Sequence, residues 1–217
     1  FNADNFMTAR LPNKRQLQQD AGLPIRDDVP LIGLVSRLVA QKGMDLAVGP
    51  LRQILSESDV QFVALGAGEY SIENALFQIS EDFRDKARVY LGYSAAQAQR
   101  IYGGSDLFLM PSRYEPCGTS QMFAMRYGSL PLVRETGGLA DTVSNYDNAA
   151  ADTGTGFVFE WETPDAVLGT LRWALDTYRH SPYAWRRMQE RAMRTDFSWT
   201  KSAGEYITLY RQISKKG

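Results

Sequence analysis

The sequence contains almost none of the residues from which disulfide frameworks and Cys/His metal sites are built. Its 217 residues include one cysteine, Cys117, and one histidine, His180. A single cysteine cannot form a disulfide within the chain, and a Cys/His metal site needs three or four such ligands. We therefore expect no internal disulfide, no bound metal, and a protein that does not require an oxidising compartment.

His180 is also a weak candidate for an acid or base in catalysis. It lies between two helical segments, in Tyr178-Arg179-His180-Ser181-Pro182, which is typical of a loop. It is far in sequence from the glycine-rich turns described below, and without it the chain offers no Ser-His-Asp set. Any proton transfer must therefore use another group.

Charge of one sign and long apolar runs are scarce as well. The formal net charge is -1, so the chain has no basic field that would attract nucleic acid. No apolar run approaches the roughly 20 residues that are needed to span a membrane. We predict neither nucleic acid nor a membrane as a partner.

The chain does have enough apolar sequence for one sizeable core, and strand patterns alternate with helical patterns. It is 44% apolar and 23% charged, and no linker or repeat divides it, so we expect one domain over residues 1–217. This alternation predicts the α/β class, a Rossmann-like doubly wound parallel sheet. We expect a mobile loop at 146–155 and a fraying end at 215–217. The expected strands are 31–35, 60–65, 89–91, 106–110, 130–133 and 156–159, and the expected helices are 44–55, 69–80, 95–102, 119–127, 139–144, 164–178, 183–195 and 200–214.

The most informative turn follows the predicted strand at 106–110. Prolines and a glycine indicate a loop at the carboxyl end of this strand, where open α/β sheets bind their ligands, and Glu115 lies in it. A helical pattern begins directly after this loop. Unpaired amides and the positive end of the helix dipole favour an anion, so we expect a phosphate near Gly118, Thr119 and Ser120.

A second turn of this kind follows the predicted strand at 130–133. Thr136, Gly137 and Gly138 precede a helical turn, and the glycines permit positive φ and a close approach of the backbone to a ligand. A Gly-Gly pair after a strand is more often only a turn. Two adjacent strands that both end in amide-rich turns nevertheless favour a binding site.

A third turn, at 36–43, follows the predicted strand at 31–35 and carries two cations. Arg37 offers a planar fork of donors and Lys42 a compact point charge, and together they could clamp a diphosphate. The alternative is a pair of solvated surface charges. Their place at the carboxyl end of a strand gives the two interpretations about equal weight.

Several strings carry a resemblance to a known family. They are Ser36-Arg37 to Lys42-Gly43, Gly66-Ala67-Gly68, Pro-Ser-Arg-Tyr-Glu-Pro-Cys-Gly at 111–118, Arg-Tyr-Gly at 126–128, Thr-Gly-Gly-Leu-Ala-Asp-Thr-Val at 136–143 and Asp-Phe-Ser-Trp at 196–199. Over nearly its entire length the chain resembles bacterial glycogen synthases and plant starch synthases. The resemblance implies the C-terminal, donor-binding half of a two-domain glycosyltransferase B fold, without the N-terminal acceptor domain.

The resemblance also implies an activity and residue roles. The reaction is the retaining transfer of glucose from ADP-glucose to the non-reducing end of an α-1,4-glucan, with ADP as product and no cofactor. Arg37 and Lys42 would hold the diphosphate and stabilise charge on the leaving ADP. Glu115 would bind glucose hydroxyls and favour an oxocarbenium-like charge, rather than act as a nucleophile. The other substrate-binding positions would be Tyr93, which stacks on adenine, and Cys117, Gly118, Thr119, Thr136, Gly137 and Gly138.

Some of these positions have simpler interpretations, and some depart from the family pattern. Tyr93 follows a strand and could equally fill the core, and Cys117 could be a small buried residue. Phe123 stands where related transferases with two glutamates eight positions apart have the second, a glutamate that the synthases also lack. Thr119 and Ser120 stand where the family more often has Leu-Thr, which alters the pocket wall.

Two other functions remain open at this stage. One is a related retaining glycosyltransferase that uses UDP-glucose. The other is a non-catalytic module that binds a nucleotide or glucan, suggested by the missing half and by the lack of an acid/base set within the chain. In the family the missing domain supplies a lysine-glycine loop and acceptor-site residues, so the isolated chain should bind the donor weakly and transfer nothing. The expected location is the bacterial cytoplasm or a plastid.

Overall fold

The computed structural model describes residues 1–147 and 153–214 of the chain. Its centre is a six-stranded parallel sheet with the strand order β3-β2-β1-β4-β5-β6. This is the order of a Rossmann-like doubly wound sheet, so the predicted α/β class is confirmed. The strands are β1 (Leu31–Leu38), β2 (Gln61–Gly68), β3 (Ala87–Leu91), β4 (Leu107–Met110), β5 (Leu130–Arg134) and β6 (Phe157–Phe159).

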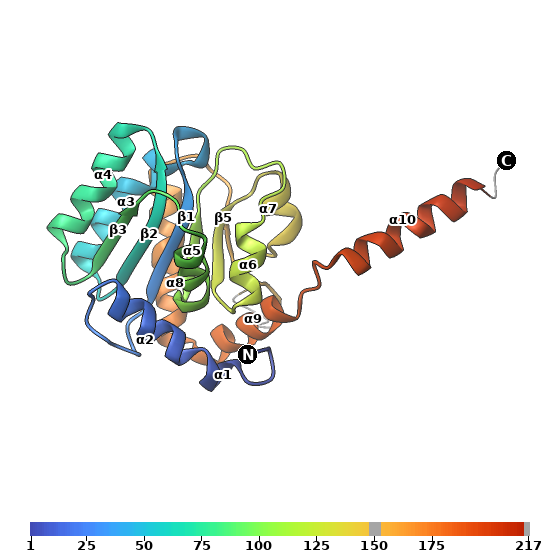
Figure 1. The fold of residues 1–217 in the computed structure, drawn as a ribbon, viewed down its shortest axis with the longest axis horizontal. Coiled ribbons are helices and arrows are strands. Elements are labelled where there is room, and N and C mark those ends of the chain that lie inside the picture. Colours follow the sequence, from blue (N-terminus) through green and yellow to red (C-terminus); the bar gives the residue numbers. More distant parts are fainter. Residues whose placement is uncertain (148–152, 215–217) are drawn as a thin grey trace.

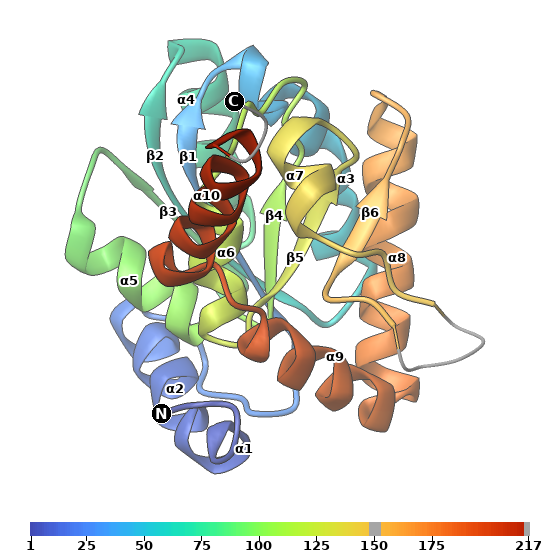
Figure 2. The ribbon, with the colours of Figure 1, turned by 90° about the vertical axis from the view of Figure 1, so that its right-hand side faces the viewer.

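Helices cover both faces of the sheet (Figure 2). One layer contains α3 (Met44–Glu57), α4 (Tyr70–Asp82) and α8 (Pro164–His180). The other contains α5 (Ala95–Gly104), α6 (Ser120–Arg126) and α7 (Gly137–Thr142). Around these layers, α2 (Leu11–Asp20) packs on α5, α9 (Pro182–Arg194) packs on α6 and α8, and the short elements are α1 (Phe6–Ala9) and the 3-10 turn η1 (Ala40–Lys42).

The central strands are apolar on both faces because helices cover both faces. All four residues of β4 are buried, and nearly all buried apolar side chains of the described residues form one cluster that extends across the sheet. Phe62, Phe108 and Phe157 are the largest side chains that are fully buried in it. The sequence of a strand that is covered on both faces is a continuous run of apolar residues, which is why these strands could be predicted from the sequence.

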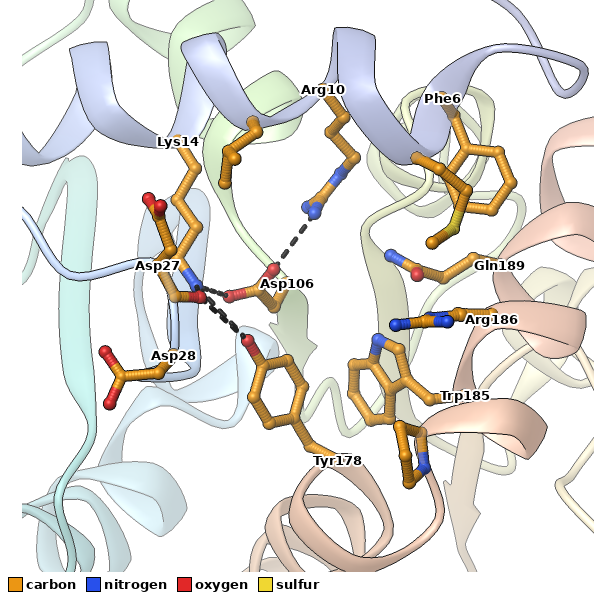
Figure 3. Close-up of a pocket in the computed structure, with 13 residues that line it drawn as sticks. Phe6, Arg10, Lys14, Asp27, Asp28, Asp106, Tyr178, Trp185, Arg186 and Gln189 are labelled. Carbon is orange, nitrogen blue, oxygen red and sulfur yellow. Dashed lines mark hydrogen bonds and ion pairs between the residues drawn. The ribbon is translucent and has the colours of Figure 1, made fainter.

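The N-terminal helices are held to the sheet by a buried ionic cluster at the amino end of β4 (Figure 3). Asp106 lies 2.9 Å from Arg10 Nη1 and 2.7 Å from Lys14 Nζ, and the amide of Leu31 donates to it at 2.9 Å. Burial raises the pKa of Asp106, but the positive charges of Lys14 and Arg10 lower it by more, so this pKa lies below its ordinary value of 3.8.

The sequence did not predict α1 and α2. The inward face of α2 consists of Lys14, Leu17 and Gln18. Gln18 Nε2 donates to Gln61 Oε1 at 2.7 Å, and Lys14 belongs to the ionic cluster, so polar bonds replace most of the usual apolar stripe. A search for apolar periodicity therefore could not find this helix.

Some predicted boundaries were wrong. β1 and β2 each continue three residues further, so Arg37 lies within a strand, paired with Ala67, and not in a turn. His180 is the exposed last residue of α8, with Nδ1 2.8 Å from Asp176 Oδ1, and not a loop residue. Residues 148–152 of the loop predicted to be mobile, and the predicted fraying end at 215–217, lie outside the described residues.

The last helix, α10 (Trp199–Ser214), projects away from the body of the molecule (Figure 1). Within the described chain, none of its residues is buried. Several of its large apolar side chains are about half exposed or more, among them Trp199, Tyr206, Tyr210 and Ile213. None of the helices in residues 1–147 and 153–214 has the length and apolarity needed to cross a membrane.

Candidate functional site

The carboxyl ends of β1 and β4 form the switch point of the sheet. The chain leaves β1 toward β2 on one side and leaves β4 toward β5 on the other, which opens a crevice between the two connections. The connections touch, because the amide of Arg113 donates to Gln41 O at 3.0 Å. Gly43 has a φ of 66°, and a Cβ there would lie 1.8 Å from Pro111 O, so this contact requires glycine.

Lys42 and Glu115 meet across this crevice. Lys42 ends η1, and Glu115 lies in the loop after β4. Lys42 Nζ lies 2.5 Å from Glu115 Oε2, and Ser112 Oγ donates to the same oxygen at 3.4 Å. The two side chains are 16% and 9% exposed, so the pair is sheltered but still open on one side. The sequence identified both residues, but it associated Lys42 with Arg37 and did not predict this contact.

Arg37 and Tyr93 line a neighbouring cavity. Its volume is about 430 Å³, within the range of small-ligand pockets, and its walls come from β1, β2, α5, α6 and the turn after β3. Arg37 is exposed, and within residues 1–147 and 153–214 its side chain makes one weak hydrogen bond, from Nη2 to Gln41 Oε1 at 3.3 Å. Tyr93 is 91% exposed, which contradicts the interpretation of Tyr93 as a core residue. An arginine and an exposed aromatic ring thus flank an open apolar cavity.

Gln99, Tyr102, Ser120 and Phe123 also line this cavity. Ser120 had been predicted to contribute its amide to a phosphate site, but the other three were not predicted as site residues. Tyr102 OH donates to Ser120 Oγ at 3.1 Å, which joins α5 to the start of α6. Gln99 and Tyr102 are three positions apart on α5, the helix that follows Tyr93, and share one face of it. This spacing was the signal in the sequence for Tyr102, but a buried aromatic residue at helical spacing is most often a core residue.

The turn after β4 is organised by Gln121, which the sequence analysis missed. Gln121 Nε2 donates to Cys117 O at 3.1 Å, to Gly118 O at 3.0 Å and to Thr142 Oγ1 at 3.1 Å. These bonds tie the two carbonyls to the first turn of α6. Within residues 1–147 and 153–214, no protein group accepts from the amides of Gly118, Thr119 and Ser120, so the predicted phosphate contact of these amides stays a prediction.

The glycines of the second turn have a packing role that differs from the predicted approach to a ligand. A Cβ at Gly137 would lie 2.2 Å from Glu115 O, and one at Gly138 would lie 2.0 Å from Cys117 O. The amide of Gly138 donates to Glu115 O at 2.9 Å. The backbone of the neighbouring loop therefore occupies the space above both glycines. Contacts of Thr136 and Gly137 with a phosphate stay a prediction, whereas the Gly138 amide is already paired.

Cys117 and Thr119 are exposed and line a groove of about 800 Å³ beside α6. The far wall of this groove is the segment 194–199, which leads into α10. The interpretation of Cys117 as a small buried residue is therefore wrong. Phe123 lines both this groove and the cavity of Arg37 and Tyr93, so the two hollows adjoin at α6.

Other parts of the described chain are less suited to binding a ligand or a metal ion. Among the described residues, no group of three or more His, Cys, Asp or Glu side chains is placed to hold a metal ion. A cavity of about 310 Å³ adjoins the ionic cluster of Asp106 (Figure 3), at the amino ends of the strands. Parallel sheets bind ligands at the opposite ends. The carboxyl-end crevice is therefore the candidate site.

The sequence and the fold of the chain are similar to those of known proteins. The family model described as glycosyl transferases group 1 matches residues 16–192. Glycogen synthase of Streptococcus pneumoniae (strain Hungary19A-6) is 47% identical over 213 residues, which are 98% of this chain and 44% of that protein. This chain thus spans less than half the length of this curated relative.

Solved structures give a similar result. The catalytic domain of starch synthase IV from Arabidopsis thaliana, bound to ADP and acarbose, matches with a TM-score of 0.88 and 37% identity over 98% of this chain and 44% of that one. Sucrose-phosphate synthase from Thermosynechococcus elongatus matches with a TM-score of 0.66 and 21% identity, covering 95% of this chain and 51% of that one. The second likeness concerns the fold alone.

Proposed function

This chain belongs to the group 1 glycosyl transferases, and on that premise we propose that it is the donor-binding half of a glucan synthase that uses ADP-glucose. The observation that carries the proposal is the Lys42–Glu115 pair at the switch point, next to the cavity of Arg37 and Tyr93. Its position at the carboxyl ends of the strands suits a nucleotide-sugar site, and its residues would provide a cation for a phosphate and a carboxylate for a sugar.

The choice of donor rests on similarity and on the cavity. A solved relative, 37% identical, was bound to ADP and acarbose, and the curated relatives at 47% identity are glycogen synthases. In the chain itself, Tyr93 offers an exposed ring for a base, and the apolar cavity beside it accommodates one. The acceptor is an α-1,4-glucan and the transfer retains configuration, as the resemblance implies.

The mechanism follows from charge. Lys42 is paired with Glu115, so an incoming diphosphate competes with Glu115 for the lysine. Arg37, exposed and weakly bonded, is available to bind the same diphosphate with its planar fork. Both cations would then stabilise the charge that develops on the leaving ADP. Glu115 would be released toward the sugar, where its carboxylate stabilises an oxocarbenium-like charge.

The chain works with a partner domain in this proposal. It covers 44% of the length of its curated relative, and the apolar face of α10 has no contact in the described chain that buries it. A missing N-terminal half that packs on this face, and closes over the crevice, would account for both. We expect the isolated chain to bind donor and to be inactive in transfer. The proposed location is the bacterial cytoplasm or a plastid.

The test is calorimetric titration of the 217-residue chain with ADP and with UDP. We expect ADP to bind more tightly than UDP, and the Arg37→Ala, Lys42→Ala double variant to lose ADP binding. The matched control is the Arg52→Ala, Arg172→Ala double variant, which removes the same charge from ion pairs outside the site. Tighter binding of UDP would favour a UDP-dependent transferase. Normal ADP binding by the first double variant would contradict the proposed phosphate site.

A further inference from the structure

A third charged residue beside the crevice is Arg113, whose guanidinium contacts Ala40, Asp45 and Glu162. We propose that Arg113 is a positioning residue that sets the distance between Lys42 and Glu115. This inference rests on the proposed function, because it assigns Arg113 a role in that reaction. Arg113 lines neither the cavity of Tyr93 nor the groove of Cys117, so it does not act by contact with the donor there.

Arg113 binds the turn that carries Lys42 on both sides of that lysine. Before Lys42, Arg113 Nη1 donates to Ala40 O at 2.6 Å, and the Arg113 amide donates to Gln41 O at 3.0 Å. After Lys42, the guanidinium forms a two-point ion pair with Asp45 at 2.5 and 2.8 Å. The backbone of Lys42 is thus held between contacts from one residue of the opposite loop.

Arg113 also belongs to the loop that carries Glu115, two residues further on. That loop is fixed from its other side, because Arg134 Nε donates to Ser112 O at 2.9 Å and Arg134 Nη2 donates to Arg113 O. A third contact, from Arg113 Nε to Glu162 Oε1 at 2.6 Å, ties the loop to the connection between β6 and α8. Arg113 therefore links the backbone segments of both Lys42 and Glu115.

The chemistry of this link requires arginine. Arg113 uses its Nε and both terminal nitrogens in directions that the planar guanidinium fixes. A lysine has one charged nitrogen and no planar fork, so it can keep only part of this set. Surface ion pairs usually contribute little, but the bidentate geometry and the network make this one an exception. Both carboxylates raise the pKa of Arg113, Asp45 mainly through its hydrogen bond, so the cation stays charged.

The experiment uses the full-length protein and measures kcat and KM for ADP-glucose. Displacement of reacting groups by about 1 Å can cost about 10²-fold in rate, so we expect Arg113→Met to lower kcat by roughly 10- to 100-fold and to change KM less than about threefold. Arg113→Lys should restore part of kcat. Asp45→Asn, which leaves both loops unchanged in sequence, should lower kcat in the same direction and by less.

The matched control is Arg172→Met. Arg172 makes a similar two-point pair with Glu57, at 2.9 and 3.0 Å, at the other end of the same helix α3. Both variants should lose thermal stability, but only Arg113→Met should lose kcat per folded molecule. An unchanged kcat in Arg113→Met, or an equal loss in Arg172→Met, would overturn the positioning role. Failure of the wild-type protein to transfer glucose from ADP-glucose would instead overturn the proposed function, and the positioning role with it.

Discussion

Strand β4 has a buried carboxylate next to each of its ends, and the two have different surroundings. Asp106 precedes the strand and is paired with two cations and a backbone amide. Glu115 follows the strand and is paired with one cation, Lys42, and with the hydroxyl of Ser112 at the long distance of 3.4 Å. The oxygens of Asp106 therefore have nearly all the hydrogen-bond donors that they can accept from, whereas those of Glu115 can accept further hydrogen bonds.

The difference indicates which group can take part in chemistry. Asp106, whose side chain is 5% exposed, directly precedes β4 and has partners in the α1–α2 segment and at the start of β1, so it joins elements of the scaffold. Glu115 and Lys42 lie in two loops that face an open crevice, and their mutual bond can be exchanged for bonds to a ligand. A saturated ionic cluster contributes to stability, whereas an unsaturated pair at the carboxyl edge is suited to binding and catalysis.

The largest effect of a substitution is expected on stability, at Asp106 beside the amino end of β4. Asp106→Asn removes the negative charge and leaves Arg10 and Lys14 buried without their counterion, so we expect a loss of about 3–5 kcal/mol in the free energy of unfolding. Urea unfolding of both proteins would measure it. ADP affinity of the folded fraction should stay the same. A loss under 1 kcal/mol would show that the cluster does not support the scaffold.

An effect of comparable size, but on kcat, is expected at Glu115, beyond the carboxyl end of β4. Glu115→Ala in the full-length protein should lower kcat by about 10²–10³-fold, because the carboxylate acts on charge that develops in the transition state. KM should change little, and urea unfolding should show little loss of stability. Steady-state kinetics with ADP-glucose and a glucan would measure this. An unchanged kcat would refute the role of Glu115 and remove the contrast with Asp106.

The contrast between the two ends also explains what the sequence could predict. The carboxyl end was accessible because glycines, prolines and charged residues mark a turn after each apolar strand, as at Glu115 and Gly118. The amino end was not, because Lys14 and Arg10 lie about 90 residues from Asp106, and nothing in their local sequence shows that they pair. Separation along the chain, by 21 and 68 residues, also concealed the links from Gln121 to Thr142 and from Arg113 to Asp45.

At the candidate site, the positions of the residues in the fold were predicted better than their contacts. Arg37, Lys42, Tyr93 and Glu115 all lie at the carboxyl edge, which the position of each after a strand had indicated. The pairing of Lys42 with Glu115 depends on the strand order, because β1 and β4 are neighbours although β2 and β3 lie between them in the chain. Strand order comes from tertiary packing, and the local sequence does not encode it.

A smaller effect is expected when acid is used in place of a substitution at Asp106. Its pKa is lowered in the folded protein, so its contribution to stability is fully present above the unfolded value of about 4 and is lost as the pH falls through the folded value. Between pH 5 and pH 3, the free energy of unfolding should therefore decrease more in the wild type than in Asp106→Asn. Equal losses in the two proteins would show that Asp106 does not carry this pH dependence.

The smallest effect is expected at the exposed edge of the proposed donor cavity. Tyr93 is 91% exposed, so Tyr93→Ala should not alter stability, but loss of stacking on a base costs about 1–3 kcal/mol, and we expect ADP affinity to fall about tenfold. The matched control is Tyr70→Ala, because Tyr70 is 82% exposed and lies outside the cavity. Calorimetry with ADP measures both. Equal affinities in the two variants would mean that the base does not stack on Tyr93. The carboxyl end of β4 would then bind the phosphates of ADP, and the nucleoside would lie elsewhere.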